Sequence, residues 1–276
     1  MAFFGFGRSK GVYNLCSTLV GRGPRFFECP DKTTSYIALS EICKPSRSSS
    51  SDLGRALGRL LVAENSRLQE VDIKTITAIT VSKGGFVGNL PRLIATISPA
   101  PAGVEKMHRE DHVALLRDQV VAEFGFREGR LDLIEEGWSG RLIASNDGAA
   151  RRFALLQDKS LPGEAVFPAS IRTVRFDPSA LAVLTERMWV FLLPRESYAN
   201  LSSGLGQLGV GAPQQCADVY SKARERDDDR TIWTVAGVDR SWKHYGDFRL
   251  GLEDGAVPLF DLSRWLSELV NGRNKP

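Results

Sequence analysis

Residues that bind metals or carry redox chemistry are scarce in this chain. Its 276 residues include 4 cysteines and 3 histidines. The cysteines have no C-x-x-C spacing and no paired histidines nearby, which argues against a zinc ribbon or a redox pair of the C-x-x-C type. We therefore expect free thiols at positions 16, 29, 43 and 216.

Long apolar runs are also missing. The longest strongly apolar stretches, such as 189–193, fall far below the roughly 18 to 20 residues that a helix needs to cross a bilayer. The N-terminal stretch MAFFGFGRSK lacks the continuous apolar run and the small-residue cleavage site of a secretory signal. These absences predict no membrane partner, no export and a cytoplasmic location.

A large excess of one charge sign is missing as well. The formal net charge is +3, which is too small to indicate nucleic acid or an anionic membrane as a partner. Residues 1–60 carry about +5 and the rest of the chain about −2. Apolar residues make up 42% and charged residues 25%, which is typical of a globular protein and excludes collagen-like and coiled-coil classes.

The spacing of apolar residues predicts alternating strands and helices. Residues 110–124 have apolar side chains at helical spacing, and Asp177 before Pro178 is a typical helix start. The expected helices cover 53–63 (capped by Asp52), 110–124, 148–158, 178–187 and 259–270. The expected strands cover 71–83 and 93–97, which we expect to pair antiparallel, and then 140–145, 172–176 and 189–193.

This order of elements predicts an α/β or α+β fold, with a mixed sheet and helices packed against it. The sequence shows no internal repeat and no clear interdomain linker. We therefore expect one globular unit over 31–276, preceded by an N-terminal arm over 1–30 whose order the sequence leaves open.

The most informative segment is the turn between the expected strand at 140–145 and the helix that follows. A helix N-terminus presents unpaired N–H groups and a positive dipole end, and Gly148 lets a ligand approach the backbone. Arg151 and Arg152 stand in the first turn, where cations oppose the dipole at a cost of roughly a few tenths of a kcal/mol unless an anion offsets them. The candidate ligand-binding residues are Asn146, Asp147, Gly148, Arg151 and Arg152. The structural alternative is a capped helix whose arginines simply face water.

The same segment resembles the ParB and sulfiredoxin superfamily. In that superfamily a strand is followed by Gly-x-His/Arg-Arg and by a helix with a small residue three positions after the arginine. Gly148-Ala149-Ala150-Arg151, followed by Ala154, has that spacing. The resemblance implies a ParB/sulfiredoxin-like core that binds phosphate or a nucleotide. Ala150 departs from the pattern, because it stands where the family has His or Arg, and this departure favours an inactive or altered relative.

The histidines give a second, weaker candidate. His108 and His112 lie one helical turn apart, a spacing that can hold zinc. A third ligand is not apparent, and the intervening glutamate has the wrong offset for an H-E-x-x-H site. We expect no metal at this pair.

Two further patterns match binding motifs only in part. Gly204 to Gly209 satisfies G-x-G-x-x-G, but the strand before it and the helix after it that a dinucleotide site needs are not predicted, so we expect a flexible loop. The acidic run at 225–230 could coordinate a hard cation, but its arginines favour a solvated turn.

Residues 233–249 interleave aromatic rings with cations, a combination that can stack nucleic-acid bases. The alternative is a hairpin whose aromatic rings pack into the core while the charges face water. We favour this packing for both Trp233 and Trp242.

Together, the sequence favours a protein that binds a nucleotide or another phosphate-bearing ligand at 146–152, without deciding whether it turns that ligand over. Two alternatives from other classes stay open. One is an interaction or structural protein without a small-molecule site, and the other is a nucleic-acid-associated protein. No catalytic residue and no cofactor can be assigned from the sequence.

Overall fold

The computed structural model of the chain describes residues 39–43, 51–82, 85–87, 108–146, 148–220, 232–254 and 259–272. The expected arm at 1–30, the expected strand at 93–97, Asp147 and the acidic run at 225–230 lie outside these residues. Among the described residues, no helix is long and apolar enough to cross a membrane.

The described residues form two compact units instead of the single unit expected over 31–276. The discontinuous unit contains the described parts of 39–62 and 176–272, and the central unit contains those of 63–175. Each unit builds its own sheet and hydrophobic core. Apolar periodicity shows which face of an element is buried but not which core it joins, so the sequence does not reveal this division.

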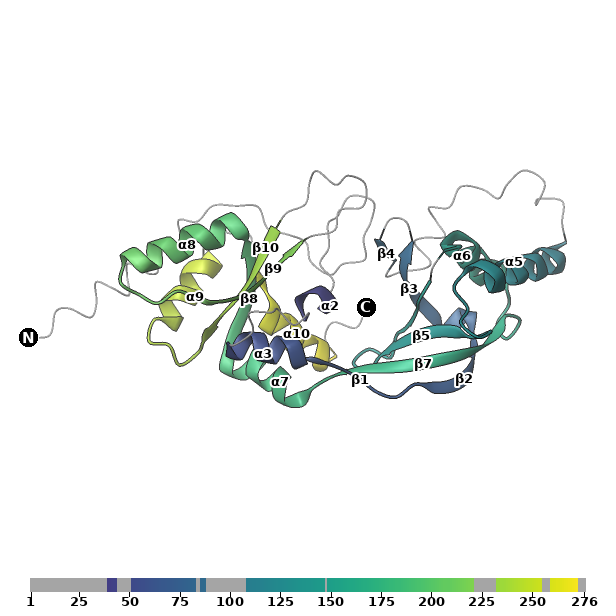
Figure 1. The fold of residues 1–276 in the computed structure, drawn as a ribbon, viewed down its shortest axis with the longest axis horizontal. Helices are drawn as coiled ribbons and strands as arrows, with labels where there is room; N and C mark the ends of the chain where they lie inside the picture. Colours follow the sequence, from purple (N-terminus) through teal and green to yellow (C-terminus); the bar gives the residue numbers. More distant parts are fainter. Residues whose placement is uncertain are drawn as a thin grey trace, which may run out of the picture. The chain divides into compact units, whose positions relative to one another are not determined.

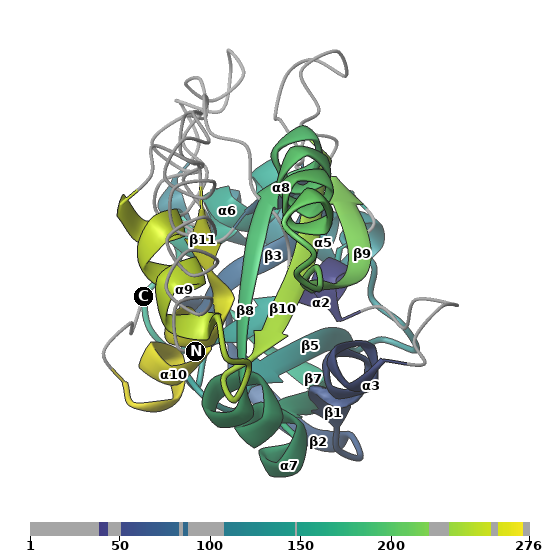
Figure 2. The same ribbon diagram turned by 90° about the vertical axis from the view of Figure 1, so that its left-hand side faces the viewer.

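In the discontinuous unit, helices cover both faces of an antiparallel sheet with the strand order β11-β8-β10-β9 (Figure 1). Figure 2 shows β8 and β10 side by side in this sheet. The strands are β8 (Met188–Pro194), β9 (Gln214–Tyr220), β10 (Ile232–Asp239) and β11 (Phe260–Asp261). The helices are α2 (Leu39–Ile42), α3 (Asp52–Arg59), α7 (Pro178–Ala182), α8 (Arg195–Gln207), α9 (Tyr245–Asp254) and α10 (Leu262–Val270).

Strand β8 explains this layered arrangement. Side chains alternate between the two faces of a strand, and in β8 both sets are apolar and buried. Val190 and Leu192 join the core that contains residues of α3, α7 and α10, whereas Trp189 and Phe191 join the core that contains residues of α8 and α9. The expected strand at 189–193 is therefore confirmed.

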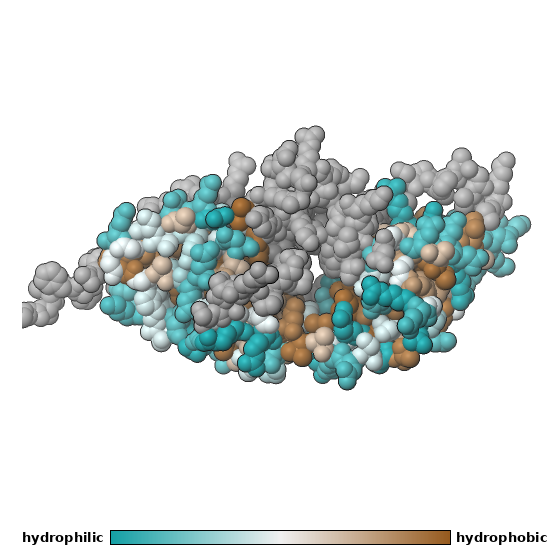
Figure 3. All heavy atoms as spheres, in the orientation of Figure 1, coloured by the Kyte–Doolittle hydropathy of each residue, from teal (hydrophilic) through white to brown (hydrophobic). Residues whose placement is uncertain are grey.

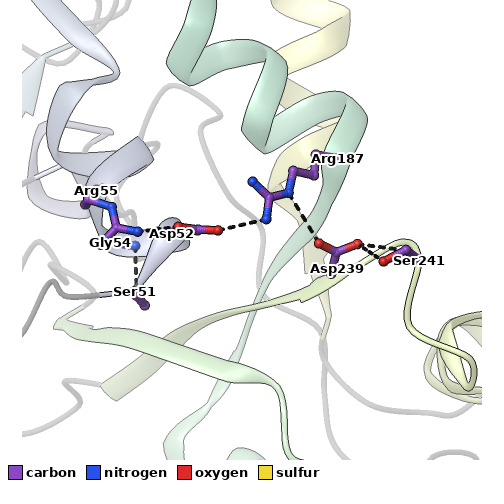
Figure 4. Close-up of polar contacts among 7 residues, drawn as sticks. All are labelled: Ser51, Asp52, Gly54, Arg55, Arg187, Asp239 and Ser241. Carbon is purple, nitrogen blue, oxygen red and sulfur yellow. Dashed lines mark hydrogen bonds and ion pairs between the residues drawn. The ribbon is translucent and has the colours of Figure 1, made fainter.

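Arg187 connects two elements at one end of this sheet (Figure 4). It lies in a π-helical segment, Val183–Arg187, that continues α7. Its guanidinium contacts Asp52 of α3 at 2.8 Å and Asp239 of β10 at 3.3 Å. Hydrogen bonds from Ser241 and from Arg187 hold the pKa of Asp239 below its ordinary value. This cluster joins parts of the unit that are distant in the sequence.

The central unit has a mixed sheet, with helices α5 (Arg109–Glu123) and α6 (Ala150–Lys159) contributing to its core. The strand order is β1-β7-β5-β6-β3-β4, and β2 also pairs with β7. β5 with β7 and β3 with β6 are parallel pairs, whereas β2 with β7, β5 with β6 and β3 with β4 are antiparallel. The strands are β1 (Leu61–Ala63), β2 (Arg67–Asp72), β3 (Ile76–Ser82), β4 (Gly85–Val87), β5 (Leu131–Glu136), β6 (Leu142–Ala144) and β7 (Val166–Phe176). The expected fold class, a mixed sheet with packed helices, is confirmed.

Two contacts fix α6 in this unit. The rings of Phe124 and Phe153 stack with centroids 4.1 Å apart, which joins the end of α5 to α6. The buried amide of Gln157 donates hydrogen bonds to the carbonyl oxygens of Ile73 and Ile76 at 2.9 and 2.6 Å. The beginning of α6 is therefore held by α5, and its body is held beside β3.

Several expected elements have different bounds in the structure. Helix α3 ends at Arg59, whereas the helix was expected to continue to 63, and 61–63 form strand β1. Its N-cap is Ser51, not Asp52, because the Ser51 hydroxyl accepts a hydrogen bond from the Gly54 amide at 3.1 Å. Within 71–83, a helical turn at 73–75 separates β2 from β3, and β3 pairs with the short β4.

The surface of the described residues mixes hydrophilic and hydrophobic side chains, as Figure 3 shows for one face. Apolar side chains such as Leu68, which is 65% exposed, are present on it. Single exposed apolar residues are ordinary on soluble folds and do not by themselves identify a site.

Candidate functional site

The candidate turn connects β6 to α6 in the central unit. After β6 ends at Ala144, the side-chain amide of Asn146 donates a hydrogen bond to the Gly148 carbonyl at 3.2 Å. This bond fixes the local shape of the turn. Asp147, the remaining candidate in the turn itself, lies outside the described residues.

The start of α6 has no side-chain cap. Its N-cap residue is Ala149, whose methyl group cannot accept a hydrogen bond from the first-turn amides. Ala149 also has φ 50° and ψ 22°, a left-handed conformation that costs a non-glycine residue about 1–2 kcal/mol. Strained backbone of this kind is enriched at ligand-binding sites. Ala149 therefore provides no side-chain acceptor for the first-turn amides.

The two arginines of the first turn have different environments. Arg152 forms an ion pair with Glu123 at the end of α5, and their side chains are 40% and 53% exposed. Arg151 is exposed and makes no ion pair with any residue in the described part of the chain. For Arg152, the anion that offsets the charge is therefore Glu123 of the same chain.

Gly148 lies close to the end of α5. A Cβ atom at this position would approach the Glu123 carbonyl oxygen to 3.3 Å, which is tighter than ordinary packing. The structure thus brings Gly148, Arg152 and Glu123 together. Sequence reasoning missed Glu123, because nothing in a single sequence shows that the end of one helix meets the start of another.

Ala150 is the residue that departs from the ParB and sulfiredoxin pattern that the sequence of 148–154 resembles. It is 6% exposed and belongs to the core of the central unit. A side chain that packs inward cannot contact a phosphate at the surface of the turn.

The histidine pair lies at the start of α5. His108 is the exposed N-cap residue and makes no side-chain capping hydrogen bond, and His112 is half-buried in the first turn. Within the described ranges, no three His, Cys, Asp or Glu side chains are grouped so as to hold a metal ion.

The glycine motif at 204–209 is not the flexible loop that the sequence predicts. Residues 204–207 form the last turn of α8, and Gly209, with φ 65°, follows the helix end. The glycines therefore end a helix instead of beginning one. A dinucleotide site needs the opposite arrangement, in which the glycines come between a strand and the start of a helix.

The aromatic residues at 233–249 pack mainly inward. Trp233 is 5% exposed and Phe248 is fully buried, so neither offers a ring face to a nucleic-acid base. Trp242 is half-buried and meets Phe248 edge-on at 5.5 Å. The expected packing of Trp233 is confirmed. The expected hairpin is wrong, because strand β10 is followed by helix α9 and pairs instead with the earlier strands β8 and β9.

An open groove of about 310 Å³ lies on the central unit. None of the candidate residues lines it. It is lined by Leu68, Gln69, Glu70, Arg130, Pro168 and Ala169. Ligand pockets usually enclose most of the ligand surface, and this groove is too open to do so.

Comparison with known proteins does not assign the chain to a family. No family model, no curated protein and no solved structure matches the chain.

Proposed function

We propose that this protein binds a phosphate-bearing ligand, such as a nucleotide, at the start of α6. The observation that carries the proposal is Arg151, an exposed cation without an ion-pair partner in the described ranges, next to a helix start that lacks a side-chain cap. A phosphate bound there would accept hydrogen bonds from the first-turn amides and would offset the Arg151 charge. The resemblance of 148–154 to the ParB and sulfiredoxin superfamily supports the same ligand class.

The Arg152–Glu123 ion pair has a supporting role in this proposal. The Glu123 carboxylate contacts Arg152 in the first turn of α6, where an unpaired negative charge would repel a phosphate. Arg152 offsets that charge. In the proposed site, Arg151 contacts the ligand and Arg152 acts through Glu123.

The proposal is for binding without an assigned reaction. The family's His/Arg position is occupied by the buried Ala150, so the site offers no imidazole at that position for proton transfer. A cytoplasmic setting, where nucleotides are abundant, forms part of the same proposal.

The experiment is a thermal-shift screen of the full chain with inorganic phosphate, pyrophosphate and ATP. A ligand that binds only the folded state stabilises it by about 2.7 kcal/mol at a concentration near 100 times its Kd. We expect at least one of these probes to raise the melting temperature of the wild type, and the Arg151→Ala variant to lose most of this rise.

The matched control is Arg172→Ala. Arg172 lies on β7 of the same unit, is exposed, and makes no ion pair within the described residues. It should keep the full response to the ligand. Equal responses in the two variants, or no response of the wild type to any of the three probes at millimolar concentration, would overturn the proposal.

A further inference from the structure

Strand β2 forms a free edge of the central sheet. It pairs with β7 on one side, and no other described strand pairs with its opposite side (Figure 1). Residues 67–70 of this strand are all exposed. An edge of this kind presents a row of unpaired backbone N–H and C=O groups, with which another strand can pair.

The other outer strands of the two sheets are protected against such pairing. β4 has three residues and β11 has two, and very short edge strands offer few groups to a partner. β9 packs against α2 and contains a β-bulge at Cys216, where its register with β10 shifts. β2 has six residues in regular register and contains no proline, lysine or bulge. Among the described strands, β2 therefore has the edge best suited to pairing.

Hydrogen bonds of β7 show which backbone groups of β2 are already used. The Thr173 carbonyl accepts a bond at 2.9 Å from the amide of Glu64, which lies between β1 and β2. The next carbonyl, that of Val174, points the other way and accepts a bond at 2.8 Å from the amide of Gly137, which follows β5. Odd-numbered residues of β7 therefore bond toward β2, and the register places odd-numbered residues of β2 opposite them.

The even-numbered residues of β2 direct their backbone groups outward. The N–H and C=O groups of Leu68 and Glu70 therefore have no backbone partner among the described residues. The Leu68 side chain is 65% exposed, more than any other large apolar side chain in the described ranges. It also lines the open groove, together with Pro168 of β7. Unpaired backbone groups and an exposed apolar side chain thus meet at one residue.

We propose that two copies of this chain associate through their β2 strands, which pair antiparallel about a two-fold axis at Leu68. A two-fold interface uses the same surface of both copies, so one edge strand is sufficient to build it. In this register the two Leu68 residues exchange both of their backbone hydrogen bonds. Their side chains lie on the same face of the joined sheet and pack against each other beside the groove.

The charges of β2 fit this register. Glu70 lies opposite Ser66 of the second copy, and Arg67 lies opposite Gln69, so no two like charges face each other directly. An axis at Glu70 would instead place two carboxylates opposite each other, which is destabilising. One strand pair buries less than the roughly 1,200–2,000 Å² of a stable interface. The dimer is therefore weak and dissociates on dilution.

The first test is sedimentation of the full chain at concentrations between about 1 µM and 1 mM. The weight-average mass should rise with concentration from the 30.4 kDa of a single chain toward twice that mass. A wild type that stays monomeric at about 1 mM would overturn the proposal.

Two variants test whether the dimer uses β2. Leu68→Lys removes the apolar contact and places two cations at the axis, so this variant should stay monomeric over the same range. Leu161→Lys is the matched control, because Leu161 is 57% exposed and follows α6 in the same unit. It should associate as the wild type does. Equal behaviour of the two variants would show that the contact lies elsewhere and would overturn the proposal.

Hydrogen exchange of the wild type gives a test that does not depend on a variant folding. The Leu68 amide should exchange slowly at high protein concentration and rapidly after dilution, because only the second copy provides its acceptor. The Gln69 amide, which points toward β7, should stay protected at both concentrations. Exchange at Leu68 that is independent of protein concentration would also overturn the proposal.

Discussion

Arg152 of α6 forms an ion pair with Glu123 of α5, and this contact makes the two neighbouring arginines of the first turn unequal. Arg152 has its counter-charge within the protein. Arg151 remains exposed, with no ion pair to the described residues. One contact between two helices therefore reduces an apparent double-arginine site to a single available cation.

Substitutions at the two members of this ion pair should have opposite effects on phosphate binding. Glu123→Gln removes a negative charge beside the proposed site, so phosphate should bind about 2- to 5-fold more tightly. A 5-fold change in affinity corresponds to a difference of about 1 kcal/mol in binding free energy. Arg152→Ala leaves the Glu123 charge unbalanced and should weaken binding by a similar factor. Calorimetric titration at low ionic strength measures both. Changes in the same direction for the two variants would contradict the assigned roles.

The stability of the same variants provides an internal control. Exposed ion pairs contribute roughly 0 to 1 kcal/mol, so both substitutions should change the free energy of unfolding by no more than about 1 kcal/mol. A larger loss would mean that the contact stabilises the fold and that its effect on binding is secondary.

The left-handed conformation of Ala149 predicts an unusual gain on substitution by glycine. At φ 50°, Ala149→Gly removes a steric cost, so the free energy of unfolding should rise by about 0.5–1 kcal/mol. Ala114→Gly, at an exposed position of α5, should lower it by about 1 kcal/mol, because glycine disfavours an ordinary helix. Urea unfolding of both variants checks the sign. Destabilisation by both would show that Ala149 does not adopt this conformation.

The two tryptophans of 233–249 should differ in their contribution to stability. Trp233 is nearly fully buried in the core shared by α3 and α10, so Trp233→Ala should cost about 3–5 kcal/mol. Trp242 is half-buried, and Trp242→Ala should cost less. Chemical denaturation measures both. A Trp242→Ala variant that stays fully stable but loses single-strand binding would instead support the nucleic-acid alternative.

From the lowered pKa of Glu135, we predict that this residue causes part of the acid sensitivity of the central unit. Hydrogen bonds from Arg67 at 3.0 Å and from Thr173 at 2.7 Å hold the pKa of Glu135 below its ordinary value of 4.5. Because the folded-state pKa is lowered, this contribution to stability is fully present above pH 4.5 and is lost as the pH falls through the lowered pKa.

The corresponding variant is Glu135→Gln. It should lose about 1 kcal/mol or less at neutral pH and show a shallower loss of stability as the pH falls below 4.5. Glu70→Gln on β2 is the control, because Glu70 is exposed and makes no ion pair with the described residues. Urea unfolding across this pH range compares them. Parallel pH profiles for the wild type and Glu135→Gln would contradict the assignment.

Local patterns in the sequence were sufficient for elements with a strong signal of their own. The helix expected at 110–124 is α5, because its apolar side chains follow helical spacing over several turns. Asp177 caps α7 as expected, since its carboxylate accepts a hydrogen bond from the Ala180 amide at 2.7 Å. Such signals depend only on neighbouring residues, so one sequence contains them.

Features that depend on distant contacts were missed. The apolar run at 60–63 fits a helix or a strand equally well, and pairing of β1 with β7 decides for a strand. The glycines at 204–207 have low helix propensity, yet the buried Leu201 and Leu205 pack α8 into its core. The Arg152–Glu123 pair likewise depends on how α5 and α6 pack, which local patterns do not encode.

The most direct test of the proposed binding function is a phosphate titration of isotopically labelled protein, followed through the backbone amide resonances. We predict that the amides of Ala150, Arg151 and Arg152 shift together and saturate, and that the Arg151→Ala variant needs a much higher phosphate concentration for the same effect. Unchanged amides at the start of α6 in millimolar phosphate, or saturating shifts confined to another part of the chain, would contradict it.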